Sequence, residues 1–98
     1  MNIGLDFDDT YTRDPEAWNE FIRYFTSRGH KIYCTTFRFP DQCAAVYNTI
    51  GMVIGNDNCH FTGYTAKRPF MNSKGIIIDV WIDDMPILID KGVEQGIV

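Results

Sequence analysis

Apolar residues along this chain come in short, nearly continuous runs separated by longer segments with helical spacing. Runs at residues 1–5, 31–35 and 76–82 predict buried strands, and a weaker run at residues 59–62 predicts another. Because these runs leave no polar face, they are typical of a parallel sheet that is covered on both sides.

Three segments between the runs have the spacing of amphipathic helices. The first spans residues 14–29, from an aspartate that can cap a helix to a glycine that can end one. The second spans residues 40–51 and the third about residues 66–74, and each is also followed or ended by glycine. For the segment after Pro86, a short helix and an edge strand are equally compatible with the pattern.

The alternation of strands and helices predicts one α/β domain over residues 1–98, a Rossmann-like three-layer sandwich with a mainly parallel sheet. A length of 98 residues matches one domain, and 45% apolar residues are enough for a core. Right-handed crossovers place the carboxyl ends of the strands at one edge of the sheet, where ligands bind in such folds.

Each clearly predicted strand ends in reactive groups, and a lysine stands at the start of the third helix. These residues are Asp6, Asp8, Thr35, Thr36, Lys67, Asp83 and Asp84. Carboxylates about 4 Å apart at neighbouring strand ends repel by roughly 4 kcal/mol unless a cation lies between them. A hard cation that prefers oxygen ligands, such as Mg²⁺, would relieve that repulsion.

The order of these groups resembles the four motifs of the haloacid dehalogenase (HAD) superfamily. DFDDT follows the first strand, T-x-R the second, then comes the lysine, and DD follows the last strand. The resemblance covers nearly the whole chain and implies an HAD-type Mg²⁺-dependent phosphohydrolase, a phosphomonoesterase that acts through an aspartyl-phosphate. The short spacings leave no room for a cap domain. In capless members a large substrate or a second subunit shields the site, so the resemblance is compatible with a homo-oligomer.

The resemblance assigns the catalytic roles residue by residue. Asp6 is the nucleophile, and its attack on phosphorus divides one slow displacement into two faster ones. Asp8 is the general acid and base. Thr36 binds the transferred phosphoryl group, with Thr35 as the alternative, and Lys67 stabilises charge on its oxygens.

The resemblance also implies a metal site, formed by Asp6, the backbone carbonyl of Asp8, and the pair Asp83 and Asp84. Which member of the pair binds the metal directly is open. Asp9 departs from the family pattern, because glycine is common at that position and aspartate adds negative charge near the phosphate.

Two arginines are candidate substrate ligands. Thr36-Phe37-Arg38 has the T-x-R form of some family members, including polynucleotide 3′-phosphatases, in which the arginine binds phosphate. Arg13, in the loop after the first strand, is a weaker candidate. Lys74 is the alternative to Lys67, but it lies at the far end of its predicted helix.

Composition limits the partners. A net charge of −4 and a pI of about 4.9 argue against binding to an extended duplex, while a nucleotide or a nucleic-acid 3′-phosphate remains compatible. No apolar run approaches the roughly 20 residues of a membrane span, and the start lacks a signal-peptide pattern, so we expect a cytoplasmic protein. The cysteines, at positions 34, 43 and 59, form no C-x-x-C pair and predict neither disulfides nor zinc.

Two further interpretations use the same residues. A phosphotransferase would pass the phosphoryl group to a hydroxyl acceptor instead of water. A non-catalytic phosphate-binding module, such as a receiver-like α/β domain, would have an acidic pair, a phosphorylated aspartate, a threonine and a lysine. Receivers place the phosphorylated aspartate after the third strand, where this chain has Thr62-Gly63, so we favour the phosphohydrolase.

Overall fold

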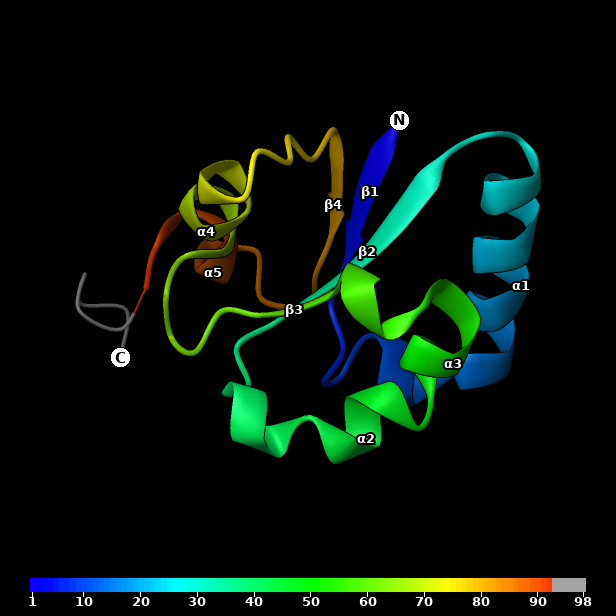
Figure 1. The fold of residues 1–98 in the computed structure, drawn as a ribbon, viewed down its shortest axis with the longest axis horizontal. Coiled ribbons are helices and arrows are strands. Elements are labelled where there is room, and N and C mark those ends of the chain that lie inside the picture. The colour runs from blue at the N-terminus through cyan, green and yellow to red at the C-terminus, as the bar shows by residue number, and fades with distance from the viewer. Residues whose placement is uncertain (93–98) are drawn as a thin grey trace.

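Four parallel strands form one sheet in the order β3-β2-β1-β4 (Figure 1). The computed structural model of the chain describes residues 1–92. The strands are β1 (Asn2–Leu5), β2 (Lys31–Thr36), β3 (Cys59–Phe61) and β4 (Val80–Ile82). The parallel sheet predicted from the apolar runs is confirmed, and all of its strand pairs are parallel.

Helices cover both faces of the sheet (Figure 1). One face carries α1 (Pro15–Ser27), α2 (Ala44–Tyr47) and α3 (Ile50–Ile54), and the other carries α4 (Lys67–Ser73) and α5 (Ile87–Asp90). Three short 3₁₀ helices connect these elements: Tyr11–Arg13, Pro40–Gln42 and Asn56–Asn58. The described chain is therefore an α/β sandwich consistent with the Rossmann-like prediction.

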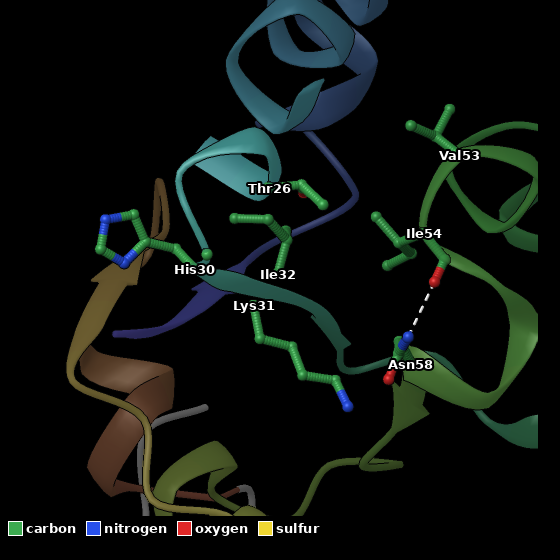
Figure 2. A pocket seen from close by; sticks show the side chains of 8 residues that line it. Thr26, His30, Lys31, Ile32, Val53, Ile54 and Asn58 are labelled. Carbon is green, nitrogen blue, oxygen red and sulfur yellow. Dashed lines mark hydrogen bonds between the residues drawn. The ribbon is translucent and has the colours of Figure 1, made fainter. Parts of the chain in front are cut away.

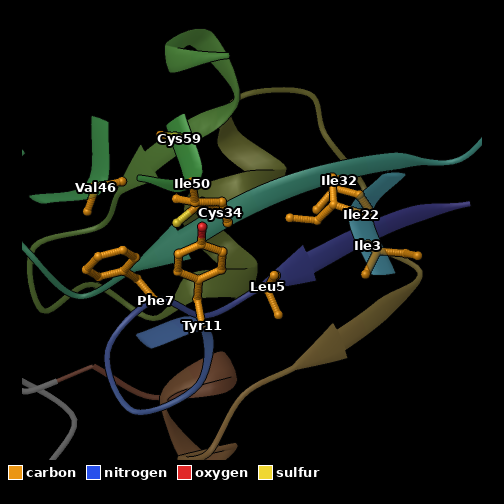
Figure 3. Packing of buried hydrophobic residues seen from close by; sticks show 10 residues of the cluster. All are labelled: Ile3, Leu5, Phe7, Tyr11, Ile22, Ile32, Cys34, Val46, Ile50 and Cys59. Atoms are coloured by element: carbon orange, nitrogen blue, oxygen red, sulfur yellow. The ribbon is translucent and has the colours of Figure 1, made fainter. Parts of the chain in front are cut away.

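The larger core lies between the sheet and α1 to α3 (Figure 3). Ile3 and Leu5 of β1 point into it, together with Ile22 of α1 and Ile50 of α3. Gly4 faces the opposite side, where a Cβ atom would lie 3.0 Å from the Trp81 ring. Successive residues of β1 thus face opposite sides of the sheet. Its apolar side chains pack in the larger core, and the lack of a side chain at Gly4 leaves space for the Trp81 ring on the other side.

The first helix forms as predicted. Asp14 accepts a hydrogen bond from the backbone N–H of Ala17 at 3.2 Å, which satisfies one of the free donors of the first turn. At the other end, Gly29 has φ 90°, a left-handed conformation that glycine adopts without strain.

The prediction of one continuous helix over residues 40–51 is wrong. The chain forms a 3₁₀ turn, α2 and α3 instead, and the break between α2 and α3 lies at Thr49, with φ −126° and ψ −98°. The Thr49 hydroxyl donates to the carbonyl of Ala45 at 2.6 Å. A side chain that binds the backbone in this way competes with helical hydrogen bonds, so the apolar spacing alone overestimates the helix.

The last strand is also shorter than predicted, because only Val80–Ile82 of residues 76–82 pair with β1. Asn2 holds the preceding residues in another way. Its side-chain amide donates to the carbonyl of Ile77 at 2.9 Å, and its backbone N–H donates to Asp79 Oδ2 at 2.7 Å. Side-chain hydrogen bonds therefore replace part of the ladder that the apolar run suggests.

The ends of β1, β2, β3 and α4 differ from the predicted ends by at most one residue. The structure decides the open alternative after Pro86 in favour of a helix, α5. Within residues 1–92, no helix combines the length and apolar character needed to cross a bilayer.

Candidate functional site

The two aspartate-rich strand ends lie side by side. Leu5 pairs with Ile82 in the parallel ladder between β1 and β4, and the backbone N–H of Asp6 donates to the carbonyl of Ile82 at 2.9 Å. Asp6 and Asp83 therefore leave adjacent strands at the same edge of the sheet. This adjacency is the geometry that the sequence predicts for a shared cation.

Lys67 joins these two strand ends from the first turn of α4. Its side chain is 1% exposed, and its Nζ donates to Asp6 Oδ1 at 2.8 Å and to Asp83 Oδ2 at 2.5 Å. A buried ammonium requires such partners, because burying it unpaired costs several kcal/mol. The rival, Lys74, is exposed at the end of α4, with its Nζ over the Phe70 ring. Of these two lysines, only Lys67 reaches the acidic groups.

Thr10 bridges two of the carboxylates, a contact that the sequence analysis missed. Its hydroxyl lies 3.0 Å from Asp6 Oδ2 and 3.1 Å from Asp84 Oδ1, and it accepts a hydrogen bond from the backbone N–H of Asp84 at 3.2 Å. A hydroxyl has one proton, so it donates to one carboxylate at a time. The sequence feature that could have indicated this contact is the position of Thr10 at the end of DFDDT, four residues after Asp6.

The carboxylates are close enough to influence one another. Asp6, Asp83 and Asp84 each offer an oxygen within 4.8 Å of the others, with Asp6 buried, Asp83 half-buried and Asp84 exposed. Burial raises the pKa of Asp6 from 3.8 to about 7, against the lowering effect of the Lys67 charge. A hydrogen bond with Asp6 lowers the pKa of Asp84. The pKa values of Asp6 and Asp84 are therefore shifted in opposite directions, and Asp6 is the carboxylate that takes up a proton more readily.

This group of residues fits a divalent cation. Three carboxylates against one ammonium leave a formal charge of −2 when all are ionised, which one divalent ion balances. The donors are carboxylate oxygens, which suit Mg²⁺ or Ca²⁺ better than softer metals. Both oxygens of Asp83 already accept hydrogen bonds, one from Lys67 and one from the backbone N–H of Met85 at 2.9 Å. Neither oxygen of Asp84 is held by a positive charge in this way.

Asp8 and Arg38 form a bidentate pair at the mouth of the site. Arg38 Nε and Nη2 each donate to one Asp8 oxygen at 2.9 Å. The guanidinium also donates to the carbonyl of Gln42 at 3.3 Å and lies 5.1 Å above the Phe7 ring. The Asp8 side chain is 51% exposed. The arginine predicted to bind phosphate thus holds the predicted general acid and base in this state.

The two candidate threonines occupy different environments. Thr36 lines the cavity beside Lys67, and its hydroxyl accepts from the backbone N–H of Arg38 at 3.3 Å. Thr35 is fully buried, and its hydroxyl has no hydrogen-bond partner within residues 1–92. Arg13 is exposed in the 3₁₀ helix Tyr11–Arg13 and does not line the cavity. By position, Thr36 is the better candidate, while neither Thr35 nor Arg13 reaches the cavity.

A cavity of about 140 Å³ opens above these groups at the carboxyl edge of the sheet. Asp9 contributes to its wall and has φ 63°, a left-handed conformation that glycine adopts most easily and that aspartate tolerates. That conformation is a physical reason for the glycine common at this position in the family that the sequence resembles. The lining residues are Asp6, Asp8, Asp9, Thr36, Phe37, Lys67, Asp83, Asp84, Met85 and Leu88.

A larger cavity, of about 400 Å³, lies at the opposite edge of the sheet, beside the start of β2 (Figure 2). Lys31 and Ile32 of β2, Thr26 of α1 and Val53 of α3 contribute to its walls. None of its lining residues carries a carboxylate. The cavity at the carboxyl edge is therefore the better candidate for catalysis, although it is the smaller of the two.

Comparison of the chain with protein-family models, with curated protein sequences and with solved structures found no match. The function is therefore inferred from the geometry of the site.

Proposed function

We propose that the protein is a Mg²⁺-dependent phosphohydrolase of the HAD type, with Asp6 as the nucleophile. The observation that carries the proposal is the environment of Asp6, a buried carboxylate at a strand end with one oxygen bonded to Lys67 and the other to Thr10. Asp83 and Asp84 lie beside it. This arrangement supports an oriented nucleophile next to a cation site and a fixed positive charge.

In the first step, an Asp6 oxygen attacks phosphorus, a new P–O bond forms, and the bond to the leaving alcohol breaks. The leaving oxygen takes a proton from Asp8. In the second step, water attacks the aspartyl-phosphate, Asp8 takes its proton, and the P–O bond to Asp6 breaks. Lys67 and Thr36 bind the phosphoryl oxygens. Bound Mg²⁺ supplies the positive charge that lets a phosphate approach three carboxylates.

To give a proton to the leaving oxygen, Asp8 must face that oxygen, but in this structure both of its carboxylate oxygens accept hydrogen bonds from Arg38. We infer that Arg38 exchanges Asp8 for the substrate phosphate, since a guanidinium fork fits either group. The exchange would free the Asp8 carboxyl group to reach the leaving oxygen. The ion pair in the structure is then compatible with phosphate binding by Arg38 and with acid and base catalysis by Asp8.

In this proposal the two aspartates after β4, Asp83 and Asp84, have different roles. Both oxygens of Asp83 are occupied by Lys67 and a backbone N–H, so Asp83 fixes the lysine. Asp84 lacks those contacts and is the better direct metal ligand with Asp6, and the backbone carbonyl of Asp8 completes the set that the sequence predicts.

The direct test is hydrolysis of a simple phosphomonoester by the purified protein with Mg²⁺. We expect turnover by the wild type, loss of turnover with EDTA, and loss in Asp6→Asn. Asp57→Asn is the matched control, because Asp57 is an exposed aspartate in a 3₁₀ turn. Activity that persisted in Asp6→Asn or in EDTA would exclude this mechanism.

Repeated turnover also separates hydrolysis from the alternatives. A receiver-like module would accept one phosphoryl group from acetyl phosphate and keep it. A phosphotransferase would release product faster when a hydroxyl acceptor is added. Release of several equivalents of inorganic phosphate per protein in water alone supports the hydrolase.

A further inference from the structure

An exposed group of aromatic rings stands beside the mouth of the candidate site. Tyr64 is 50% exposed and Phe39 is 41% exposed. Their ring centroids are 4.9 Å apart in an edge-to-face arrangement, and the Tyr64 ring lies 5.9 Å from that of Phe37. Apolar rings gathered at the surface cost free energy in water, so such a patch indicates a binding surface. We call these three residues the aromatic platform.

The platform is continuous with the site. Phe37 follows Thr36 at the end of β2, and both line the same cavity as Asp6 and Lys67. The loop after β3 is tied to this strand end, because the backbone N–H of Thr62 donates to the carbonyl of Thr36 at 2.8 Å. Tyr64 extends from that loop, so the platform begins at the cavity wall and leads away from the acidic groups.

The backbone holds Tyr64 in an unfavourable conformation. Its φ is 65°, a region that tyrosine, unlike asparagine or aspartate, rarely adopts. Gly63 before it has φ 52°, and a Cβ atom there would lie 2.8 Å from two atoms of the Phe39 ring. The close packing of Phe39 on Gly63 therefore fixes the turn that presents Tyr64. Strain of this kind persists at functional sites, where the surrounding structure imposes it.

We propose that the aromatic platform stacks the base of a nucleotide whose phosphate lies at Asp6 and Lys67. The phosphate part of this inference rests on the proposed function. A base is flat, stacks on aromatic rings, and is separated from its phosphate by a sugar, which would span the wall at Phe37. The substrate is a phosphorylated nucleoside, free or at the end of a short strand. The net charge of −4 makes an extended strand a poor ligand.

Other phosphorylated groups fit the platform less well. In phosphotyrosine the ring is bonded directly to the phosphate oxygen, so no linker separates the two, and of the platform residues only Phe37 lines the cavity. A small sugar phosphate has no apolar face large enough to cover Tyr64 and Phe39. Because Tyr64 and Phe39 lie outside the lining of the cavity, a base on a sugar linker fits the platform better.

The kinetic test compares the wild type with Tyr64→Ala, Tyr64→Trp and Tyr24→Ala. Stacking on a ring is worth enough that its loss should raise KM for a nucleoside monophosphate about 5- to 150-fold, with kcat nearly unchanged. Tyr64→Trp should retain the low KM. Tyr24 is an equally exposed tyrosine on α1 and serves as the control. For β-glycerophosphate, which has no ring, KM should be the same in all four proteins.

A binding assay separates this inference from the proposed function. Asp6→Asn and the double variant with Tyr64→Ala are titrated with adenosine monophosphate, a 3′-phosphorylated dinucleotide and a phosphotyrosine peptide. Nucleotide binding that weakens with Tyr64→Ala supports the platform even where the wild type hydrolyses nothing. Binding of the mononucleotide alone identifies a free nucleotide, and tighter binding of the dinucleotide identifies a strand end. Equal nucleotide affinity in both proteins, or Tyr64-dependent binding of the peptide alone, would overturn the inference.

Discussion

Lys67 Nζ donates to Asp6 Oδ1 at 2.8 Å, although the two residues are 61 positions apart in the chain. The contact links the first turn of α4 to the end of β1, and the same ammonium holds Asp83 after β4. One side chain therefore fixes the relative positions of three elements at the carboxyl edge. It also supplies the positive charge nearest to the proposed nucleophile.

Replacing Lys67 with methionine should destabilise the fold. Methionine has similar length but leaves two carboxylates without their partner, and breaking a buried pair in this way costs about 3–5 kcal/mol. Urea denaturation at pH 7.5 in EDTA measures the change. Lys74→Met, on the same helix but exposed, should stay within about 0.5 kcal/mol of the wild type. Equal stability of the two variants would show that the buried contacts contribute little.

Asp6→Asn should make the stability of the metal-free protein less dependent on pH. The pKa of Asp6 is raised by burial from 3.8 to about 7, so its contribution to stability is fully present below pH 3.8 and is lost as pH rises through 7. An uncharged asparagine avoids that loss, although it also removes a carboxylate partner from Lys67. The free energy of unfolding of Asp6→Asn relative to the wild type should therefore rise by up to about 4 kcal/mol between pH 4 and pH 8.

Urea denaturation in EDTA at both pH values measures this change, and the comparison with the wild type cancels titrating groups that are distant from Asp6. Asp57→Asn should change stability equally little at pH 4 and pH 8. If the difference between Asp6→Asn and the wild type were the same at both pH values, burial would not destabilise the ionised carboxylate.

Mg²⁺ should stabilise the wild type and should do so less in Asp84→Asn. Ligand at about 100 times its Kd adds about 2.7 kcal/mol to the free energy of unfolding, or several degrees in Tm. Asp83→Asn should lower stability without Mg²⁺, because Lys67 loses a partner, but should keep most of the response to Mg²⁺. Thermal unfolding over a Mg²⁺ titration measures both effects. The reverse pattern would make Asp83 the direct ligand.

Thr10→Val should weaken both stability and hydrolysis. Loss of the hydroxyl leaves Asp6 Oδ2 without that partner, which costs about 1–3 kcal/mol for a buried acceptor. Thr10→Ser keeps the hydroxyl and should retain most of the activity. The backbone carbonyl of Thr10 accepts from Trp18 Nε1 in either case, so the loop itself should stay in place. Equal kcat for the valine and serine variants would remove Thr10 from the site.

The grouping of the aspartates and Lys67 at one edge of the sheet could be predicted because its signals are local. Asp6 and Asp83 follow apolar runs directly, and a parallel sheet brings such strand ends to one edge. Lys67 was preferred over Lys74 from its position at the start of a helix. Thr10 was missed as a contact because its hydroxyl meets Asp84 across 74 positions of sequence.

Other features depend on partners that no local pattern reveals. The sequence predicts that Arg38 binds substrate phosphate and does not predict its bidentate pair with Asp8, which lies 30 positions away in the chain. The break at Thr49 arises from one side-chain hydrogen bond. The aromatic platform was not predicted, because Tyr64 becomes a neighbour of Phe39 only through a strained turn.

The sequence by itself determined the parallel α/β order and the polar group that follows each strand, because hydrophobic periodicity and helix ends are properties of adjacent residues. The tertiary structure alone decided which carboxylates lie close to one another, which carboxylate pairs with Arg38 and which rings are exposed beside the site. Those outcomes depend on distances of a few ångströms between side chains from different elements. Such distances are set only when the elements pack together.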